Sequence, residues 1–208
     1  MATEIESSLI TEPDGRFLGD TMKTIILALA LFGLCQSARA AAAQNLPDPL
    51  SAEKWFVGTW ICKGTQHASP MGPATEFTDR FSFHMALGGS WLLYHIDQLK
   101  GPVKGNQTLL GSITWDANAK VHVRRDLNIG GSRVDVTSPG WDGDKMVFTG
   151  YMVAGDEKLP VKQTFSKKGD AAYDSALKVT DADGNPAQWE EESCKKVSGA
   201  RARTPHHP

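Results

Sequence analysis

The chain has 208 residues, which is enough for one domain of ordinary size. Its 22 Lys and Arg residues nearly balance its 24 Asp and Glu residues, and this near-neutrality argues against a nucleic-acid-binding protein. With 40% hydrophobic and 22% charged residues, the chain is predicted to be globular. Its three cysteines are too few for a small scaffold built on disulfides.

The N-terminal part of the chain has the layout of an export signal. Lys23 precedes an apolar run over 25–35 that is too short to span a bilayer, and Ala38 and Ala40 fit an A-x-A cleavage site. We therefore expect residues 22–40 to be a cleaved signal peptide that sends the chain to the periplasm or outside the cell. The alternative is a buried helix of the folded domain.

Residues 1–21 do not fit the basic start of a signal peptide. They carry five acidic residues and a single basic one, whereas Met22 followed by Lys23 is an ordinary start. We interpret residues 1–21 as a non-native upstream extension. Without the three basic and five acidic residues of 1–40, the remaining chain is formally neutral. We therefore expect neither nucleic-acid binding nor stable membrane insertion.

The rest of the chain has the pattern of an all-β domain. Residues 41–50 form a predicted linker, and Ser51 is placed to cap a short helix over 52–57. Ten β-type runs then alternate with Gly, Asp, Asn and Pro turns: 59–63, 76–85, 91–99, 108–115, 121–127, 133–137, 145–153, 158–165, 173–180 and 188–197. This even spacing predicts an antiparallel up-and-down barrel or a sandwich over 51–197, followed by a disordered tail over 198–208.

Three short phrases in this domain occur in the order found in a known family. Gly58-Thr59-Trp60 resembles the G-x-W signature of lipocalin-like (calycin) barrels. Together with residues 55–57, 88–92 and 114–116, it resembles the exported bacterial family catalogued as domain of unknown function 1579 (DUF1579). This resemblance covers 51–197 and implies a lipocalin-like barrel of about ten strands. It implies no activity, because that family has none assigned.

The period-two alternation of the runs predicts which side chains face the barrel interior. In the run over 121–127, the apolar Val121 and Val123 are predicted to face inward, and His122, Arg124 and Asp126 outward. The residues predicted to line a ligand site are Phe77, Phe81, Phe83, Val121, Val123, Val134, Val136, Phe148 and Phe165, with Tyr94, His95 or Gln163 as polar anchors.

Two cysteines remain after cleavage of the signal, and they are predicted to form a disulfide. Cys62 lies on the first run and Cys194 on the last, which pair when an up-and-down barrel closes. Cys62 shares the inward parity of Trp60, whereas Cys194 shares the parity of Glu190 and Glu192. Either a β-bulge follows Trp189, or the barrel interior is partly polar there.

The favoured function is the binding of a small apolar or amphipathic molecule in the barrel. The first alternative is an interaction or structural protein of the cell envelope with a packed core. The second is an enzyme or haem protein that uses a histidine such as His95. We predict no catalytic residue, metal ligand or cofactor, and the oligomeric state is left open. An internal void of some hundreds of Å³ would distinguish a binder from a packed structural protein.

Overall fold

The computed structural model describes residues 48–70 and 72–197. The upstream extension (1–21), the signal peptide (22–40), most of the linker (41–50) and the tail (198–208) lie outside the described residues. Within the described residues, no helix is long and apolar enough to cross a membrane.

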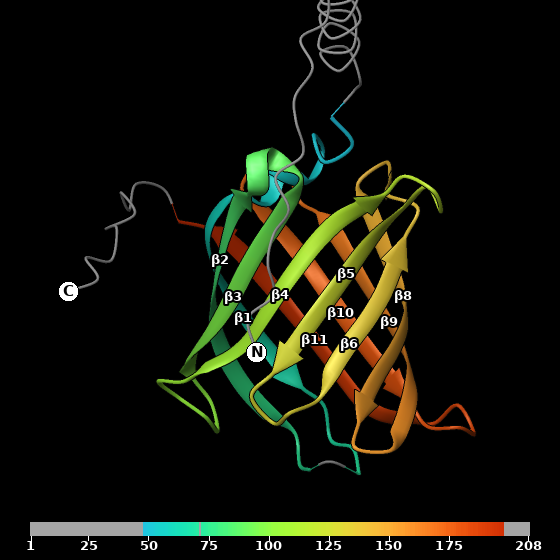
Figure 1. Ribbon diagram of the computed structural model, residues 1–208. Helices are drawn as coiled ribbons and strands as arrows, with labels where there is room; N and C mark the ends of the chain where they lie inside the picture. Colours follow the sequence, from blue (N-terminus) through green and yellow to red (C-terminus); the bar gives the residue numbers. More distant parts are fainter. Residues whose placement is uncertain (1–47, 71, 198–208) are drawn as a thin grey trace, which may run out of the picture. The chain divides into compact units, whose positions relative to one another are not determined.

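The described residues form antiparallel strands with two short 3₁₀ helices (Figure 1). In chain order the elements are η2 (Glu53–Phe56), β1 (Gly58–Gln66), β2 (Thr75–Ala86), η3 (Leu87–Gly89), β3 (Trp91–Lys100), β4 (Gln107–Asp116), β5 (Val121–Asn128), β6 (Arg133–Ser138), β7 (Trp141–Asp142), β8 (Lys145–Ala154), β9 (Glu157–Lys167), β10 (Ala172–Thr180) and β11 (Pro186–Lys196). All ten predicted strands are present. The two-residue β7 was not predicted, because so short a segment has no alternation to detect.

The strands form one closed barrel. From β1 to β6 and from β8 to β11, each strand pairs with the next one along the chain, and β1 pairs with β11. β6 pairs with β8 and closes the sheet, while β7 adds a short edge to β8. Figure 1 shows the tilted strands surrounding a common interior. The prediction of an all-β, antiparallel up-and-down barrel of about ten strands is therefore confirmed.

The predicted short helix is present, but Ser51 does not cap it. The helix is the 3₁₀ turn η2, with Ala52 at its N-cap position and no side-chain capping bond there. Asp48 instead stabilises the approach to the turn, because its carboxylate accepts a hydrogen bond from the backbone N–H of Leu50 at 3.0 Å. In place of a side-chain cap, the backbone N–H groups of Glu53 and Lys54 donate to the carbonyl oxygen of Leu50 at 3.1 and 3.2 Å.

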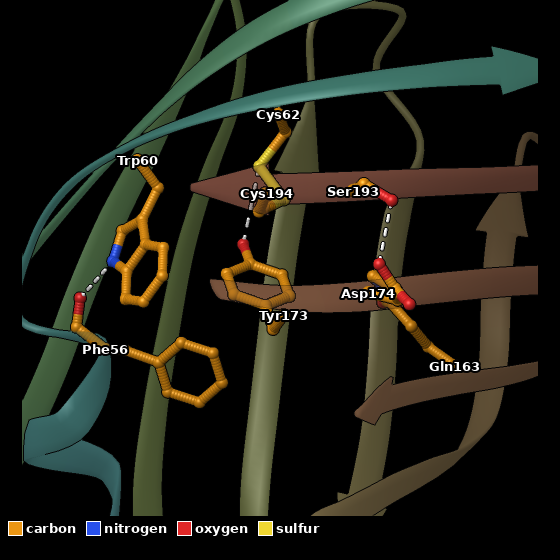
Figure 2. Close-up of a disulfide and its surroundings, with 9 residues drawn as sticks. Phe56, Trp60, Cys62, Gln163, Tyr173, Asp174, Ser193 and Cys194 are labelled. Atoms are coloured by element: carbon orange, nitrogen blue, oxygen red, sulfur yellow. Dashed lines mark hydrogen bonds between the residues drawn. A yellow bond between two sulfur atoms is a disulfide. The ribbon is translucent and has the colours of Figure 1, made fainter. Parts of the chain in front are cut away.

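Aromatic side chains fill the barrel end that carries η2. The indole N–H of Trp60 donates to the backbone oxygen of Phe56 at 2.6 Å, which joins the turn to β1 (Figure 2). Trp60 packs edge-on against Tyr173 with ring centroids 5.0 Å apart, and Phe56 contacts the same tyrosine at 5.7 Å. Phe56, Trp60 and Tyr173 are almost fully buried. This end of the barrel is therefore closed by packed rings.

The predicted Cys62–Cys194 disulfide is present and joins the first strand to the last (Figure 2). The two residues are direct cross-strand partners, with Cα atoms 4.0 Å apart. The pairing of β1 with β11 runs without a shift from Trp60 to Gln66, so no bulge reorients Cys194. Of the two alternatives, the polar interior is correct: Glu190 and Glu192 point inward on the same face as Cys194.

Candidate ligand-binding cavity

A cavity of about 500 Å³ lies inside the barrel. Its lining includes Pro102 and Val103 from the β3–β4 connection, and Ile129 and Gly130 from the β5–β6 connection. These connections lie at the barrel end opposite η2, and Gln66 at the end of β1 lines the cavity there as well. The cavity therefore opens at the end opposite the packed rings of Phe56, Trp60 and Tyr173, which we call the aromatic plug.

One wall of the cavity is apolar and aromatic. Its members are Phe81, Phe83, Ile96, Ile113, Val134 and Phe165, all less than a tenth exposed. Phe83 stacks on Tyr94 with ring centroids 4.9 Å apart, and on Phe81 at 6.0 Å. These stacked rings form a firm surface against which an apolar body can be buried.

Most of the residues predicted from alternation do lie in the interior. Seven of them line the cavity: Phe77, Phe81, Phe83, Tyr94, Val134, Gln163 and Phe165. Val136 and Phe148 are buried in the adjoining core rather than on the cavity surface. Val121, Val123 and His95 do not line the cavity.

The prediction of which face of β5 points into the barrel is wrong. Arg124 and Asp126 are buried and line the cavity, and His122 is buried on the same face. Val121 and Val123 therefore occupy the outer face, away from the cavity. The apolar residues of β5 suggested the opposite orientation because alternation alone cannot tell which face of a strand is inside.

A complete set of polar contacts explains why charged residues of β5 can be inside. The Arg124 Nε donates to Asp126 at 2.9 Å, and the Tyr94 hydroxyl donates to the same carboxylate. The Arg124 guanidinium also lies 5.5 Å from the ring centre of Phe148. Burial opposes the charge of Arg124, yet Asp126 and Tyr94 raise its pKa above the ordinary value, so it stays charged. Burial likewise raises the pKa of Tyr94 well above its usual value, so its hydroxyl keeps the proton.

Gly111 makes this contact possible. It is the cross-strand partner of both Tyr94 on β3 and Asp126 on β5, so it lies between them on β4. A Cβ atom at this position would lie 2.5 Å from the tyrosine oxygen and 2.6 Å from a carboxylate oxygen. The glycine is a sequence signal of this interior contact that alternation does not detect.

His95 lies on the outside of the barrel. Leu92, Tyr94 and Ile96 are buried, so the intervening His95 and Asp97 face outward. There the His95 Nε2 lies 3.7 Å from Asp97, which also accepts a hydrogen bond from Arg80 at 2.8 Å. The prediction of His95 as an inward-facing ligand anchor is wrong. Both faces of β3 carry apolar residues, so the sequence pattern did not show which face points inward. None of the described residues lining the cavity is a histidine.

On β2 and β11, the cavity lining carries three further carboxyl groups, Asp79, Glu190 and Glu192, which together form its acidic wall. Burial is the main cause that raises the pKa of Glu192 to about 8, and the charges of Glu190 and Asp79 add to it. Burial, with Glu190, also raises the pKa of Asp79 to about 7, and burial raises that of Glu190. The three groups are therefore close enough to repel one another when ionised.

The hydrogen-bond donors around these carboxyl groups are neutral side chains: Gln98 beside Asp79, Gln188 beside Glu190 and Ser175 beside Glu192. The side-chain N–H of Gln188 donates to Glu190 at 2.6 Å. One oxygen of Asp79 is buried without a hydrogen-bond partner. Beside Glu192, the Gln163 amide donates to the Ser175 hydroxyl at 3.0 Å, and its carbonyl oxygen is also buried without a partner. Two acceptors of this wall, one Asp79 oxygen and the Gln163 carbonyl oxygen, are therefore left without a donor.

Cys62, Cys194 and Glu192 place ligand-type atoms within 4.8 Å of one another. Metal binding by cysteine requires free thiolates, and these two sulfurs are joined in the disulfide. The cluster therefore has no thiolate to offer to an ion.

Comparison with known proteins identifies the fold. No protein-family model matches the sequence, and no curated protein matches it. The crystal structure of Rv2717c from M. tuberculosis matches with a TM-score of 0.56 at 11% identity, over 74% of this chain and 99% of that one. The chain has a lipocalin-like β-barrel fold. The S-type phycobiliprotein lyase CPES from Guillardia theta also matches, with a TM-score of 0.53 at 6% identity, over 71% of this chain and 91% of that one.

The closed end of the lipocalin-like barrel holds a second set of buried titratable groups. Glu53 of η2 is fully buried, and one of its oxygens lies 3.5 Å from Nδ1 of His122, too far for a good hydrogen bond. Burial raises the pKa of Glu53 to about 7 and lowers that of His122. Both shifts favour a neutral pair.

We expect the barrel to become more stable as the pH falls from 8 to 6.5. The raised pKa of Glu53 means that the folded chain holds a proton that the unfolded chain has lost, so stability declines as the pH rises through 7. Below about pH 6.5, His122 opposes this gain because only the unfolded chain protonates it readily. Glu53→Gln should remove roughly 1 kcal/mol of the gain between pH 8 and 6.5 in urea unfolding. Glu157→Gln, at an exposed position, should leave the pH dependence unchanged; equal slopes for Glu53→Gln and the parent protein would contradict the assignment.

Proposed function

We propose that this protein binds a small amphipathic molecule in the lumen of its barrel. The observation that carries the proposal is the internal cavity of about 500 Å³, which has an aromatic wall, a polar wall and an opening at one end. Cavities of this size, mostly apolar with a few convergent polar groups, are the usual form of small-molecule sites. The fold is shared with a phycobiliprotein lyase, which is compatible with small-molecule chemistry in such a barrel.

The void favours this function over a structural protein with a packed core. A barrel of about eight strands has just enough interior to be filled by its own side chains or to hold one small ligand. Here the aromatic plug fills one end, and the other end is left hollow. The disulfide supports the further proposal that the chain works in an oxidising compartment after export, as residues 22–40 predict.

The proposal predicts that filling the cavity abolishes binding. Met152 lines the cavity and is 7% exposed, whereas its neighbour Tyr151 is 44% exposed on the outer face. Met152→Trp should weaken the binding of 1-naphthalenemethanol at least tenfold in calorimetric titration, because the larger side chain occupies the ligand's volume. Tyr151→Trp introduces the same residue at the adjacent, outward-facing position and should bind the probe like the parent protein.

Circular dichroism of both variants verifies that the barrel is folded. Native mass spectrometry of the protein from its own host should further show a co-purified small molecule that Met152→Trp lacks. Unchanged probe binding by a folded Met152→Trp variant would refute binding in the lumen.

A further inference from the structure

We infer that the ligand carries a positive charge, in the form of an organic ammonium or amidinium group attached to an apolar body. This inference rests on the proposed function and specifies its ligand class. The carboxyl groups of Asp79, Glu190 and Glu192 would receive the cationic group, and the aromatic wall would cover the apolar body.

The first support is the charge of the lining. Among the described residues that line the cavity, Arg124 is the one basic side chain, and it is already paired with Asp126. No described lysine or arginine on the lining forms an ion pair with these three carboxyl groups, although the Arg124 charge favours ionisation of Glu192. The three carboxyl groups are half-buried, and burial raises the pKa of Asp79 to about 7 and that of Glu192 to about 8, so they are only partly ionised near neutral pH. A bound cation would supply the counter-charge that stabilises their ionised form. An anionic ligand would meet repulsion from whichever of these groups are ionised.

The second, independent support is Gln163. Its side chain lines the cavity and is more than nine-tenths buried, and its amide N–H is used by the hydroxyl of Ser175. Its carbonyl oxygen has no partner. A buried acceptor is normally satisfied, so this oxygen requires a donor that the described chain does not supply. An ammonium group offers three N–H donors and no acceptor, which matches a wall made of acceptors.

The third support is the ring of Phe77 beside the acidic wall. Gly64 on β1 lies between Phe77 on β2 and Glu192 on β11. A Cβ atom at Gly64 would lie 2.4 Å from the Phe77 ring and 2.9 Å from the Cβ of Glu192. The glycine therefore leaves room over β1 for the tip of the Phe77 ring next to the Glu192 side chain. A phenyl ring beside a carboxyl group is a favourable environment for an organic cation.

The test compares three probes with the same naphthalene body and different charge. They are 1-naphthylmethylammonium, 1-naphthalenemethanol and 1-naphthoate, titrated calorimetrically into the parent protein at pH 7.5. We expect the ammonium probe to bind at least tenfold more tightly than the alcohol, and the carboxylate to bind most weakly. The double variant Glu190→Gln/Glu192→Gln should lose that tenfold preference while still binding the alcohol.

Glu191 provides a matched control, because it lies between the two residues but is exposed on the outer face, where it contacts His67. Glu191→Gln should keep the full preference for the ammonium probe. Equal binding of the alcohol and the ammonium probe to the parent protein would overturn the cationic ligand and leave the lumen site standing. Equal loss of preference in Glu191→Gln would show that general surface charge is responsible, which also overturns it. Binding of none of the three probes would count against both proposals.

Discussion

Replacing Arg124 by methionine is expected to lower the free energy of unfolding by about 3–5 kcal/mol. The side chains of Arg124 and Asp126 are 8% and 1% exposed, and they form a charge-assisted hydrogen bond inside the barrel. Without the guanidinium, the Asp126 carboxylate keeps the Tyr94 hydroxyl as its partner and has no compensating charge. A buried carboxylate in this state costs several kcal/mol, which is far more than the packing that methionine retains.

Two further variants separate this effect from a general loss of arginine. Arg124→Met/Asp126→Leu removes both charges and should recover much of the loss, because replacing a whole buried pair by apolar residues is often close to neutral. Arg125→Met alters a 69% exposed side chain whose ion pair with Asp135 is at the surface, and it should change stability by less than about 0.5 kcal/mol. Urea unfolding followed by tryptophan fluorescence measures all three. Similar values for Arg124→Met and Arg125→Met would contradict the proposed interior pair.

The topology of the barrel could be predicted from the sequence because its signals are local. Turn residues delimit each strand, and short connections force sequential neighbours to pair. The disulfide could also be predicted, since only one pairing of two cysteines exists and the barrel closes its first strand on its last. The strand bounds differ mainly because strands continue through residues without alternation, as β1 does over Gly64–Gln66.

The cavity could be predicted only in part, because the orientation of each strand depends on contacts far apart in the chain. Phe81, Phe83 and Phe165 were assigned correctly, since one face of their strands is plainly more apolar than the other. For β5 the choice depends on whether Arg124 has a buried partner. Polar residues that satisfy one another in the interior look like a solvent-exposed face when the sequence is read alone.

Alternation alone also could not decide whether Glu190 and Glu192 of the acidic wall face the interior. The conflict between the parity of Cys194 and that of Glu190 and Glu192 already indicated that the interior could be polar. Alternation could not decide between that possibility and a bulge, because a single inserted residue would reverse the parity. The unbroken register of β1 with β11 decides it. A disulfide that fixes one position of a strand therefore carries information about every residue of the same parity.

Removing the disulfide is expected to cost about 4–5 kcal/mol of stability. The bond joins residues 132 positions apart, so in the unfolded chain it closes a loop that contains almost the whole barrel. In the chain-entropy model, the stabilisation grows with the logarithm of the loop length, and a loop of this size lies near its upper range. Both cysteines are almost fully buried, so the bond stays within the core of the barrel.

The Cys62→Ala/Cys194→Ala variant tests this value in urea unfolding at equilibrium. Dithiothreitol provides an internal control, because it should destabilise the parent protein by a similar amount and leave the double variant unchanged. Cys62→Ala alone should be about as unstable as the double variant, since either change removes the same cross-link. A loss below about 1 kcal/mol in the double variant would mean that pairing of β1 with β11 persists in the unfolded chain, so that the cross-link removes little of its freedom.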